Sequence, residues 1–337
     1  ILKDAGIPYV LHILPVDKPA PDEWALGNAM MRVDLSCDLI LGVGSGVIND
    51  LCKVFAFDTG RPQMIVGTAP SMDGFASNSS SMVVDGVKLT LYNRCPQAIV
   101  LDTEVLAQAP MRMLWAGLGD MVAKYISVCE WRIAHIVIEE YYCEHVAQLM
   151  RNALKRIMAA ADHLAERDPD SVGAVAEGLV LSGFAMSFAK VSRPASGLEH
   201  YFSHMWEMMA LERGHEADLH GIQVGVGTVL TMNIYEDIKR LQPSREKAEA
   251  AMKAVRLTRI LDNWDEIQKI IREELPDREW LFGKMKQTGM PMTPEELGIS
   301  HEDVVDAFVC SRDIRDKYLS GSMLWDLGEL DDFAKRL

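Results

Sequence analysis

Several histidines lie close together in residues 196–225, and their spacing suggests metal chemistry: His200, His204, His215 and His220. His200 and His204 are four residues apart and would share one face of a helix. His220 follows a break that contains Gly214. Neutral imidazoles from two neighbouring helices can converge on one cation. The stretch is therefore either part of a metal centre or a set of helix-surface and capped core histidines.

The composition limits the classes of protein to which the chain can belong. Its 337 residues, 49% of them hydrophobic, are enough for one large domain or two ordinary ones. The formal net charge of -15 would repel a phosphate backbone, which argues against non-specific binding of nucleic acid. An anionic substrate would need a locally basic pocket.

The cysteine pattern and the hydropathy indicate the cellular compartment of the protein. The six cysteines are scattered without a CxxC pair, which favours free thiols in a reducing cytoplasm. No apolar run reaches the roughly 18 residues of a membrane span, and residues 178–189 indicate a buried helix instead. The chain opens on ILKDAGIP, without a signal peptide, and this is typical of a helix end. We therefore expect a cytoplasmic protein without a membrane span, and further residues before residue 1.

Strands alternate with helices in the first third of the chain. Residues 9–16 are rich in β-formers and predict a strand, and Asp22 can cap a helix over residues 25–33. An apolar strand then runs into GVGSG, and a helical pattern follows over residues 47–57. This order is typical of a βα unit that cradles phosphate at the helix N-terminus. The glycines match neither G-x-G-x-x-G nor a Walker A loop, so a plain tight turn remains the alternative.

A second apolar strand, residues 63–68, leads into the loop APSMDGFASNSSS. Thr68, Ser71 and Ser77 can donate to phosphate or ribose oxygens, and Asp73 can accept from the hydroxyls of a polyol. Open α/β sheets bind ligands at the carboxyl ends of their strands, which favours a ligand over a serine-rich surface loop. Residues 81–92 then predict a hairpin about Asp85-Gly86, and residues 97–102 predict a further strand.

Helices are predicted beyond residue 110, over residues 111–131, 139–166, 172–190, 197–211, 221–240 and 301–313. Asp120 and Lys124 would share a helix face beside a bend at Gly117 and Gly119, either pointing into a cleft or forming an i,i+4 ion pair. Basic side chains at positions 312, 315 and 317 could clamp a phosphate, but a solvated helix face is favoured. We place the boundary so that residues 1–108 form an α/β domain and residues 109–337 an all-helical domain.

Five motifs in order resemble the sn-glycerol-1-phosphate dehydrogenase family: GVGSGVINDLCK, TAPSMDGFAS, GLGDMVAK, EHYFSH and LHGIQVG. That family belongs to the superfamily of iron-containing alcohol dehydrogenases, glycerol dehydrogenase and dehydroquinate synthase. The resemblance covers roughly residues 35–235. It implies a dehydroquinate synthase-like fold, in which a Rossmann-like dinucleotide-binding domain with a parallel sheet precedes an all-helical domain that binds metal and substrate.

The resemblance also implies the site residues. Asp120, His200 and His220 would hold a divalent metal, and His204, Asp73 and again Asp120 would contact the substrate. Lys124 and Arg193 are the cations proposed for the substrate phosphate, whereas His215 matches nothing functional. The residues expected to bind the dinucleotide are Gly44, Gly46, Val47, Ile48, Asn49, Asp50, Thr68, Ala69, Pro70, Ser71 and Ser77.

The implied activity is the reversible reduction of dihydroxyacetone phosphate by NADH or NADPH to sn-glycerol 1-phosphate, as in phospholipid biosynthesis. The metal, Zn or Ni before Fe, would polarise the ketone, and nicotinamide would deliver hydride. A proton would reach the alkoxide from metal-bound water or a substrate hydroxyl, with His204 as a route. We also expect a homo-oligomer, a dimer or larger.

Three alternative functions stay open for a protein with this fold. One is a polyol dehydrogenase for an unphosphorylated substrate, the second a dehydroquinate-synthase-like lyase, and the third a non-catalytic metal-binding scaffold. The resemblance also places the segment that discriminates NAD from NADP upstream of residue 1, so the sequence does not choose between these two cofactors.

Overall fold

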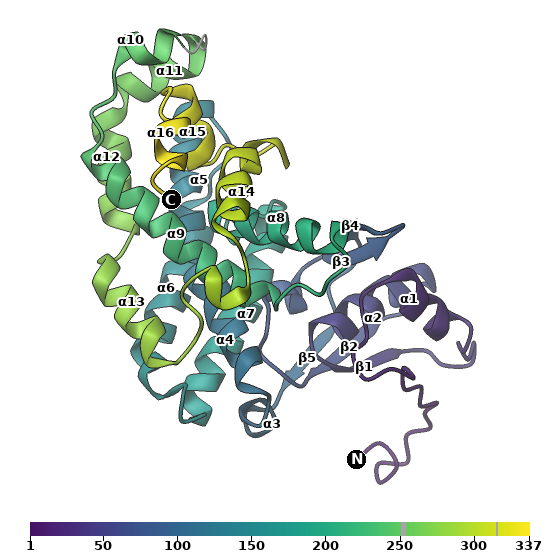
Figure 1. The fold of residues 1–337 in the computed structure, drawn as a ribbon. Coiled ribbons are helices and arrows are strands. Elements are labelled where there is room, and N and C mark those ends of the chain that lie inside the picture. Colours follow the sequence, from purple (N-terminus) through teal and green to yellow (C-terminus); the bar gives the residue numbers. More distant parts are fainter. Residues whose placement is uncertain (251–253, 315) are drawn as a thin grey trace.

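A computed structural model describes residues 1–250, 254–314 and 316–337 of the chain. In these residues a parallel sheet lies beside a larger body of helices (Figure 1). The sheet has the strand order β1-β2-β5, with the bounds Ile40–Gly44, Gln63–Gly67 and Ala98–Leu101. Its pairs are parallel, with Ile40 opposite Gln63 and Met64 opposite Ala98. The expected parallel α/β fold is therefore confirmed, and the carboxyl ends of these strands share one edge.

The predicted cap at Asp22 is present, and the other two helices next to the sheet begin differently. Helix α1 (Glu23–Met30) starts after Asp22, whose carboxylate accepts a hydrogen bond of 2.8 Å from the backbone N–H of Ala25. Helix α2 (Gly46–Asp58) follows β1 directly, and no side-chain hydrogen bond caps it at Ser45. The short helix α3 (Thr103–Ala107) is capped by the carboxylate of Asp102. The glycine turn thus leads into a helix whose first N–H groups receive no cap from the Ser45 side chain.

An antiparallel hairpin forms a second, separate sheet from β3 (Ser79–Val84) and β4 (Val87–Tyr92). It follows the short 3₁₀ helix η1 (Asp73–Ala76). Its turn residues Asp85 and Gly86 both have positive φ, 51° and 74°, as the predicted two-residue hairpin turn requires. The hairpin lies against helix α8 (Leu198–Glu212), so the first third of the chain contacts the helical part there (Figure 1).

The predicted strand over residues 9–16 is wrong. This segment has no regular secondary structure, and it lies along the surface with Val10, Leu11 and Ile13 more than half exposed. Strand propensity describes how a side chain suits a pleated, half-buried surface, so it has no effect without a hydrogen-bonded neighbour. In the described sheet β1 pairs only with β2, so residues 9–16 have not added to its free edge and have no hydrogen-bonded strand beside them.

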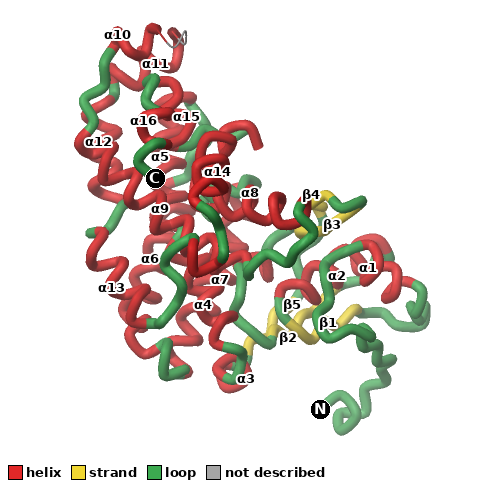
Figure 2. The backbone as a smooth tube through the Cα atoms, in the orientation of Figure 1, coloured by secondary structure: helices red, strands yellow, loops and turns green. Residues whose placement is uncertain are grey.

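Helices make up the rest of the described chain (Figure 2). Their bounds are α4 Met111–Val122, α5 Lys124–Ile138, α6 Glu144–Ala160, α7 Pro169–Ala189, α8 Leu198–Glu212, α9 His220–Arg240, α10 Arg245–Ala250, α11 Ala254–Asp262, α12 Trp264–Glu274, α13 Arg278–Gln287, α14 His301–Ile314, α15 Ser320–Asp326 and α16 Leu330–Ala334, with the 3₁₀ turns η2 Ala161–His163 and η3 Glu295–Leu297. The predicted helix over residues 111–131 is instead two helices that meet at Ala123, and α5 ends where Glu139 takes a left-handed conformation. The mostly helical C-terminal part is confirmed.

Helix α7 is long and apolar enough to cross a membrane, alone among the helices of the described residues. Over its most apolar window 56% of the residues are buried inside the protein. It packs against α6, η1 and α4. The sequence prediction of a buried helix over residues 178–189 therefore agrees with the structure.

Glycines let helices α4 and α9 touch backbone to backbone. A Cβ on Gly119 would lie 2.1 Å from the carbonyl oxygen of Gly221, and a Cβ on Gly221 would lie 1.9 Å from that of Ala116. Gly117 is packed in the same way, 1.9 Å from the carbonyl oxygen of Pro70. The expected bend at Gly117 and Gly119 is therefore wrong, because both lie inside α4 and serve close contact.

We predict that Gly221→Ala destabilises the protein, because its new methyl group cannot enter the α4–α9 contact without a backbone shift. Overpacking of this kind costs about 1–3 kcal/mol of unfolding free energy, and urea unfolding measures it. The matched control is Gly283→Ala in α13, where a Cβ would meet nothing within 4 Å. That change is expected to stabilise the helix by up to about 1 kcal/mol. Equal unfolding midpoints for the two variants would contradict the prediction.

Candidate metal centre and cofactor edge

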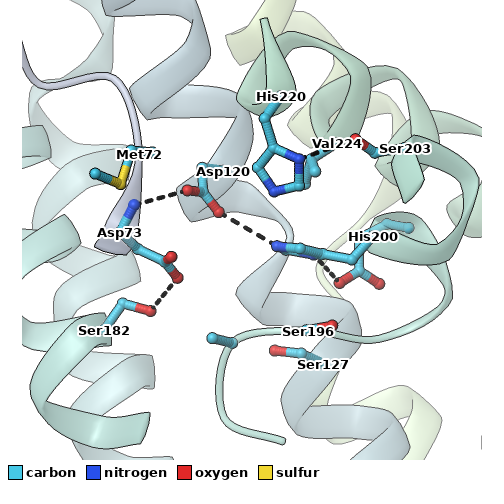
Figure 3. Close-up of polar contacts among 12 residues, drawn as sticks. Met72, Asp73, Asp120, Ser127, Ser182, Ser196, His200, Ser203, His220 and Val224 are labelled. Atoms are coloured by element: carbon cyan, nitrogen blue, oxygen red, sulfur yellow. Dashed lines mark hydrogen bonds and ion pairs between the residues drawn. The ribbon is translucent and has the colours of Figure 1, made fainter. Parts of the chain in front are cut away.

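Three helices bring Asp120, His200 and His220 together, from α4, α8 and α9 respectively (Figure 3). Nε2 of His200 lies 3.5 Å from Oδ1 of Asp120, and the rings of His200 and His220 have centroids 5.3 Å apart. Asp120 is fully buried and His200 nearly so. The structure thus brings Asp120 close to two histidines that lie 80 and 100 positions further along the chain, and their role as metal ligands stays a prediction.

Lys124 holds two carboxylates at this point. Its ammonium lies 2.8 Å from Oδ1 of Asp120 and 2.8 Å from Oδ2 of Asp73, and it donates to the carbonyl oxygen of Ala195 at 3.1 Å. Burial opposes its charge, but Asp120 and Asp73 outweigh burial and hold the pKa of Lys124 above its ordinary value. The remaining oxygen of Asp120 accepts from the backbone N–H of Asp73 at 2.9 Å. Both oxygens of the Asp120 carboxylate are therefore held in place before any ligand binds.

His200 presents one ring nitrogen to the centre and the other to a buried carboxyl group. Its Nδ1 lies 2.9 Å from Oε1 of Glu199, which also accepts from the backbone N–H of Gly197 at 2.7 Å. Burial and the charge on Lys124 hold the pKa of His200 well below its ordinary value, so this imidazole is neutral. Burial, with Glu130 nearby, raises the pKa of Glu199 to about 8. A neutral imidazole oriented by a carboxyl group at its outer nitrogen is the usual arrangement of a metal ligand.

His204 and His220 meet Glu207 on the other side of the centre. Glu207 Oε1 lies 3.2 Å from Nδ1 of His220, and Glu207 Oε2 lies 3.5 Å from Nδ1 of His204. Burial lowers the pKa of His204 to about 4. Burial opposes the ionisation of Glu207, but Lys88 and His220 outweigh it and hold the pKa of that carboxyl well below its ordinary value. Glu207 is therefore a carboxylate and His204 a neutral ring.

Two sets of ligands for one ion share His220. In one set, the donor atoms of His204, Glu207 and His220 already lie within 4.8 Å of one another. In the other, Nε2 of His220 points toward Asp120 and His200 (Figure 3). Each set contains one carboxylate that is already paired with a lysine, Glu207 with Lys88 and Asp120 with Lys124. We favour the second set, because the resemblance implies it and because Nε2 of His200 already lies 3.5 Å from Oδ1 of Asp120. Two donors held about 2.1 Å from one ion stand roughly 3–3.5 Å apart, which fits the separation of Asp120 and His200. The residues present thus fit a divalent metal with open positions.

The predicted cofactor loops meet at the carboxyl edge of the sheet. The backbone N–H of Thr68, after β2, donates to the carbonyl oxygen of Gly44, at the end of β1, at 3.0 Å. Gly46 starts α2 and packs against Met72, where an added Cβ would lie 2.9 Å from the Met72 side chain. Gly44, Val47 and Ile48 are partly exposed there, as are Thr68 and Ser71, whereas Ala69 and Pro70 are buried. The structure therefore brings the two predicted cofactor segments, residues 44–48 and 68–71, to one edge.

Three other predicted cofactor residues lie in an internal network around Lys53. The buried ammonium of Lys53 donates to the carbonyl oxygens of Gly74 and Ser79 and to Oγ of Ser77, at 2.6, 2.7 and 3.0 Å. Asn49 donates to the same Gly74 carbonyl, and the Asp50 carboxylate accepts from the backbone N–H of Ser81. The side chains of Asn49, Asp50 and Ser77 therefore hold the loop, and any cofactor contact from them remains a prediction.

The structure also places the proposed phosphate cations and the fourth histidine. Arg193 is buried, forms an ion pair with Glu140 and donates to the carbonyl oxygen of Tyr318 at 2.9 Å, so it is not open to a phosphate. Lys124 uses its ammonium on Asp120, Asp73 and Ala195, as described above. His215 lies exposed in the turn between α8 and α9.

Two of the three basic positions near the end of α14 make contacts within the protein. Arg312 lies over the ring of Trp325, 3.5 Å from its centroid, and Lys317 donates to the carbonyl oxygen of Ser196 at 3.1 Å. The third predicted residue, Arg315, falls outside the described residues.

Comparisons with known proteins identify the family of this chain. A relative named glycerol-1-phosphate dehydrogenase [NAD(P)+], from Bacillus licheniformis, is 33% identical over 312 residues, which cover 93% of this chain and 74% of the relative. One of the same name from Methanosarcina barkeri is 32% identical over 283 residues, 84% of this chain and 67% of the relative. This chain belongs to the glycerol-1-phosphate dehydrogenase family. A family model described as iron-containing alcohol dehydrogenase also matches residues 1–110.

Solved structures support the fold of this family member. A glycerol dehydrogenase from Schizosaccharomyces pombe aligns with a TM-score of 0.61 at 17% identity, over 94% of this chain and 75% of that one. An iron-containing alcohol dehydrogenase from Thermotoga maritima aligns with a TM-score of 0.61 at 14% identity, over 100% of this chain and 86% of that one. At these identities the likeness establishes the fold alone, and the fold is the predicted one.

Sequence reasoning missed Lys53, Lys88 and Glu207. Each is a charged residue that contacts its partner across a long separation in sequence or through a hairpin, so local spacing gives no signal. Local spacing does give a partial signal for Lys53. It follows Asp50 by three residues and lies on the inner face of α2, at a position that the helical period predicts to be buried. A lysine on the buried face of a predicted helix could therefore have drawn attention to this network.

We predict that Lys53→Met destabilises the protein by about 3 kcal/mol, because it removes the buried ammonium that donates to the carbonyl oxygens of Gly74 and Ser79 and that pairs with the Asp50 carboxylate. Urea unfolding measures the change. Lys155→Met, at an exposed position of α6, is the control and should stay within about 0.5 kcal/mol of the wild type. If Lys53→Met unfolds at the same urea concentration as Lys155→Met, the network is not a stabilising one.

Proposed function

We propose that this protein interconverts dihydroxyacetone phosphate and sn-glycerol 1-phosphate with NAD(P)(H). The observation that carries the proposal is the convergence of Asp120, His200 and His220 beside the carboxyl edge of a parallel sheet, in a chain 33% identical to a glycerol-1-phosphate dehydrogenase. The sheet edge supplies a place for the dinucleotide, and the helical part supplies donors for a metal. A redox reaction at a ketone needs both.

Asp120, His200 and His220 would hold one divalent metal ion, which supplies Lewis-acid polarisation of the substrate ketone. Imidazole and carboxylate donors suit Zn²⁺ and Ni²⁺, and we propose one of these before Fe²⁺. Lys124 contributes indirectly, because it fixes both Asp120 and Asp73. Asp73, also held by the hydroxyl of Ser182 at 2.8 Å, can then accept a hydrogen bond from a substrate hydroxyl.

His204 is the residue that we propose for proton transfer. Its Nδ1 faces the Glu207 carboxylate, so Nδ1 carries the hydrogen and Nε2 keeps a free lone pair. Burial lowers the pKa of this ring to about 4, which keeps it neutral at pH 7. Nε2 can therefore take a proton from the hydroxyl of sn-glycerol 1-phosphate during oxidation and return it during reduction.

The dinucleotide would lie along the strand edge and supply the hydride. The N-terminus of α2 is not capped by a side chain, and its N–H groups at residues 46–48 can donate to a pyrophosphate. The loop of residues 68–71 forms the adjacent wall. We accordingly assign dinucleotide binding to residues 1–108 and metal and substrate binding to residues 109–337.

We also propose a use for the product, a compartment and an oligomeric state for this protein. The product would serve as a glycerol backbone for phospholipid biosynthesis. Free cysteines, six in the described residues, suit a reducing cytoplasm. We also propose a homo-oligomer, a dimer or larger, which light scattering of the purified protein can measure.

The proposed reaction predicts a strong preference for the phosphorylated ketone. We expect kcat/KM for dihydroxyacetone phosphate to exceed that for dihydroxyacetone by about 100-fold or more, because a site built for a charged group loses that interaction with the analogue. Steady-state oxidation of NADH and of NADPH with each ketone measures it. A preference for the unphosphorylated ketone would instead indicate a polyol dehydrogenase.

The metal centre predicts that ligand removal abolishes both metal binding and turnover. We expect His220→Ala and Asp120→Asn to lose bound metal and to lower kcat by at least about 1,000-fold, since the ketone is no longer polarised. Metal analysis by mass spectrometry and NADH kinetics provide the two readouts. His215→Ala, in the exposed turn of the same stretch, is the control and should keep both properties. A chelator that strips the metal without slowing turnover would refute the centre.

A further inference from the structure

Lys88 carries a charge from the hairpin to the edge of the candidate metal centre. It lies on β4, and its ammonium forms an ion pair with Oε2 of Glu207 on α8. The Lys88 side chain is 25% exposed and that of Glu207 is 10% exposed, so the pair is largely shielded from water. The other oxygen of Glu207 lies 3.2 Å from Nδ1 of His220. Glu207 therefore links Lys88 of the hairpin to His220, a candidate metal ligand.

The neighbours of His220 decide which of its ring nitrogens carries the hydrogen. Besides Glu207, the hydroxyl oxygen of Ser203 lies 3.0 Å from Nδ1. Ser203 donates its own hydrogen to Oε1 of Gln223 at 3.3 Å, and the orientation of that amide is set because its Nε2 donates to the carbonyl oxygen of Asp218 at 3.0 Å. Both neighbours of Nδ1 are thus acceptors. Nδ1 must be the donor, and Nε2 is left bare.

Nε2 of His220, the ring nitrogen without a hydrogen, points into the candidate metal centre. Figure 3 shows the ring of His220 with Nδ1 on the side of Ser203 and its other nitrogen toward Asp120 and His200. A ring held in this tautomer and orientation needs no rearrangement to bind an ion there. Carboxylates that hold a ligand histidine in this way raise metal affinity in other metalloproteins.

We propose that Lys88, Glu207 and Ser203 form a positioning relay, which holds His220 as the Nδ1–H tautomer and so couples the β3–β4 hairpin to the metal centre. The relay rests on the proposed function only in taking His220 as a ligand. It assigns Glu207 a role outside the ligand set and gives Lys88, more than a hundred residues away in sequence, an effect on the centre.

The alternative is that Glu207 is itself a ligand, together with His204 and His220. That arrangement puts the ion beside Nδ1 of His220, the nitrogen nearest Glu207, and this nitrogen would then have to be bare. The hydrogen bonds above instead require it to carry a hydrogen. The two arrangements therefore predict different sets of variants that lose metal.

Zinc affinity of the whole protein tests the relay. Metal-free protein is titrated with Zn²⁺ against a chromophoric chelator, and unfolding curves confirm that each variant folds. We expect Glu207→Gln to weaken Zn²⁺ binding 10- to 100-fold, and Lys88→Met to weaken it about threefold to tenfold, because the carboxylate remains but is less firmly held. Glu207→Asp should recover part of the loss. Glu212→Gln, an exposed position at the end of α8, is the matched control.

The tautomer can be read without any metal or substrate. In metal-free protein labelled with ¹⁵N-histidine, NMR should show a protonated Nδ1 and a bare Nε2 for His220, assigned by comparison with His220→Gln. Loss of this preference in Glu207→Gln supports the relay. A bare Nδ1 in the wild type would overturn it.

Two outcomes of the zinc titration would also overturn the relay. One is a Glu207→Gln affinity equal to that of Glu212→Gln. The other is a loss in His204→Ala as large as in His220→Ala while Asp120→Asn keeps its affinity, which would place the ion at His204, Glu207 and His220. Failure of the proposed function looks different, because the wild type would then turn over no dihydroxyacetone phosphate whatever its affinity for Zn²⁺.

Discussion

The contact between helices α4 and α9 is the constraint on which the centre depends. Gly119 and Gly221 allow backbone atoms of the two helices to touch, where a side chain on either would lie about 2 Å from a carbonyl oxygen. Asp120 and His220 are the immediate neighbours of these glycines along the chain. The separation of their Cα atoms is therefore set by backbone contact in a close-packed interior of low compressibility. Helix α8 then needs only to supply His200 from one side.

Charge balance explains why the centre can stay buried before a ligand binds. Asp120 and Asp73 bring two negative charges under the surface, and Lys124 compensates one of them within the same cluster. His200 is neutral because of burial and of Lys124. The cluster is thus left with one excess negative charge and bare ring nitrogens. This arrangement attracts a cation, while Lys124 limits the repulsion between the two buried carboxylates. On the outer side, Lys88 compensates Glu207 in the same manner.

The sequence predicts the local features of this protein well. The spacing of His200 and His204, the cap at Asp22 and the hairpin turn at Asp85 depend on neighbours along the chain, and the structure confirms them. The grouping of Asp120 with the histidines came from the resemblance alone, because nothing in the spacing of α4 and α9 shows that their glycines touch. The strand expected over residues 9–16 failed for the same reason, since a strand exists only with a partner. Lys88 and Glu207, 119 positions apart, lie beyond any local pattern.

The backbone contact of α4 and α9 has a consequence for the size of ion that the protein can accept. A ligand cage built on flexible side chains can swell around a large cation, as the oxygen-rich sites for Ca²⁺ do with bonds of roughly 2.3–2.6 Å. Here the backbones beside Asp120 and His220 are in contact, so the Cα atoms of these two residues cannot approach further, and they can separate only if the two helices do. The glycines therefore fix the anchor points of two proposed ligands, and only the side chains of Asp120 and His220 can adjust to the radius of an ion.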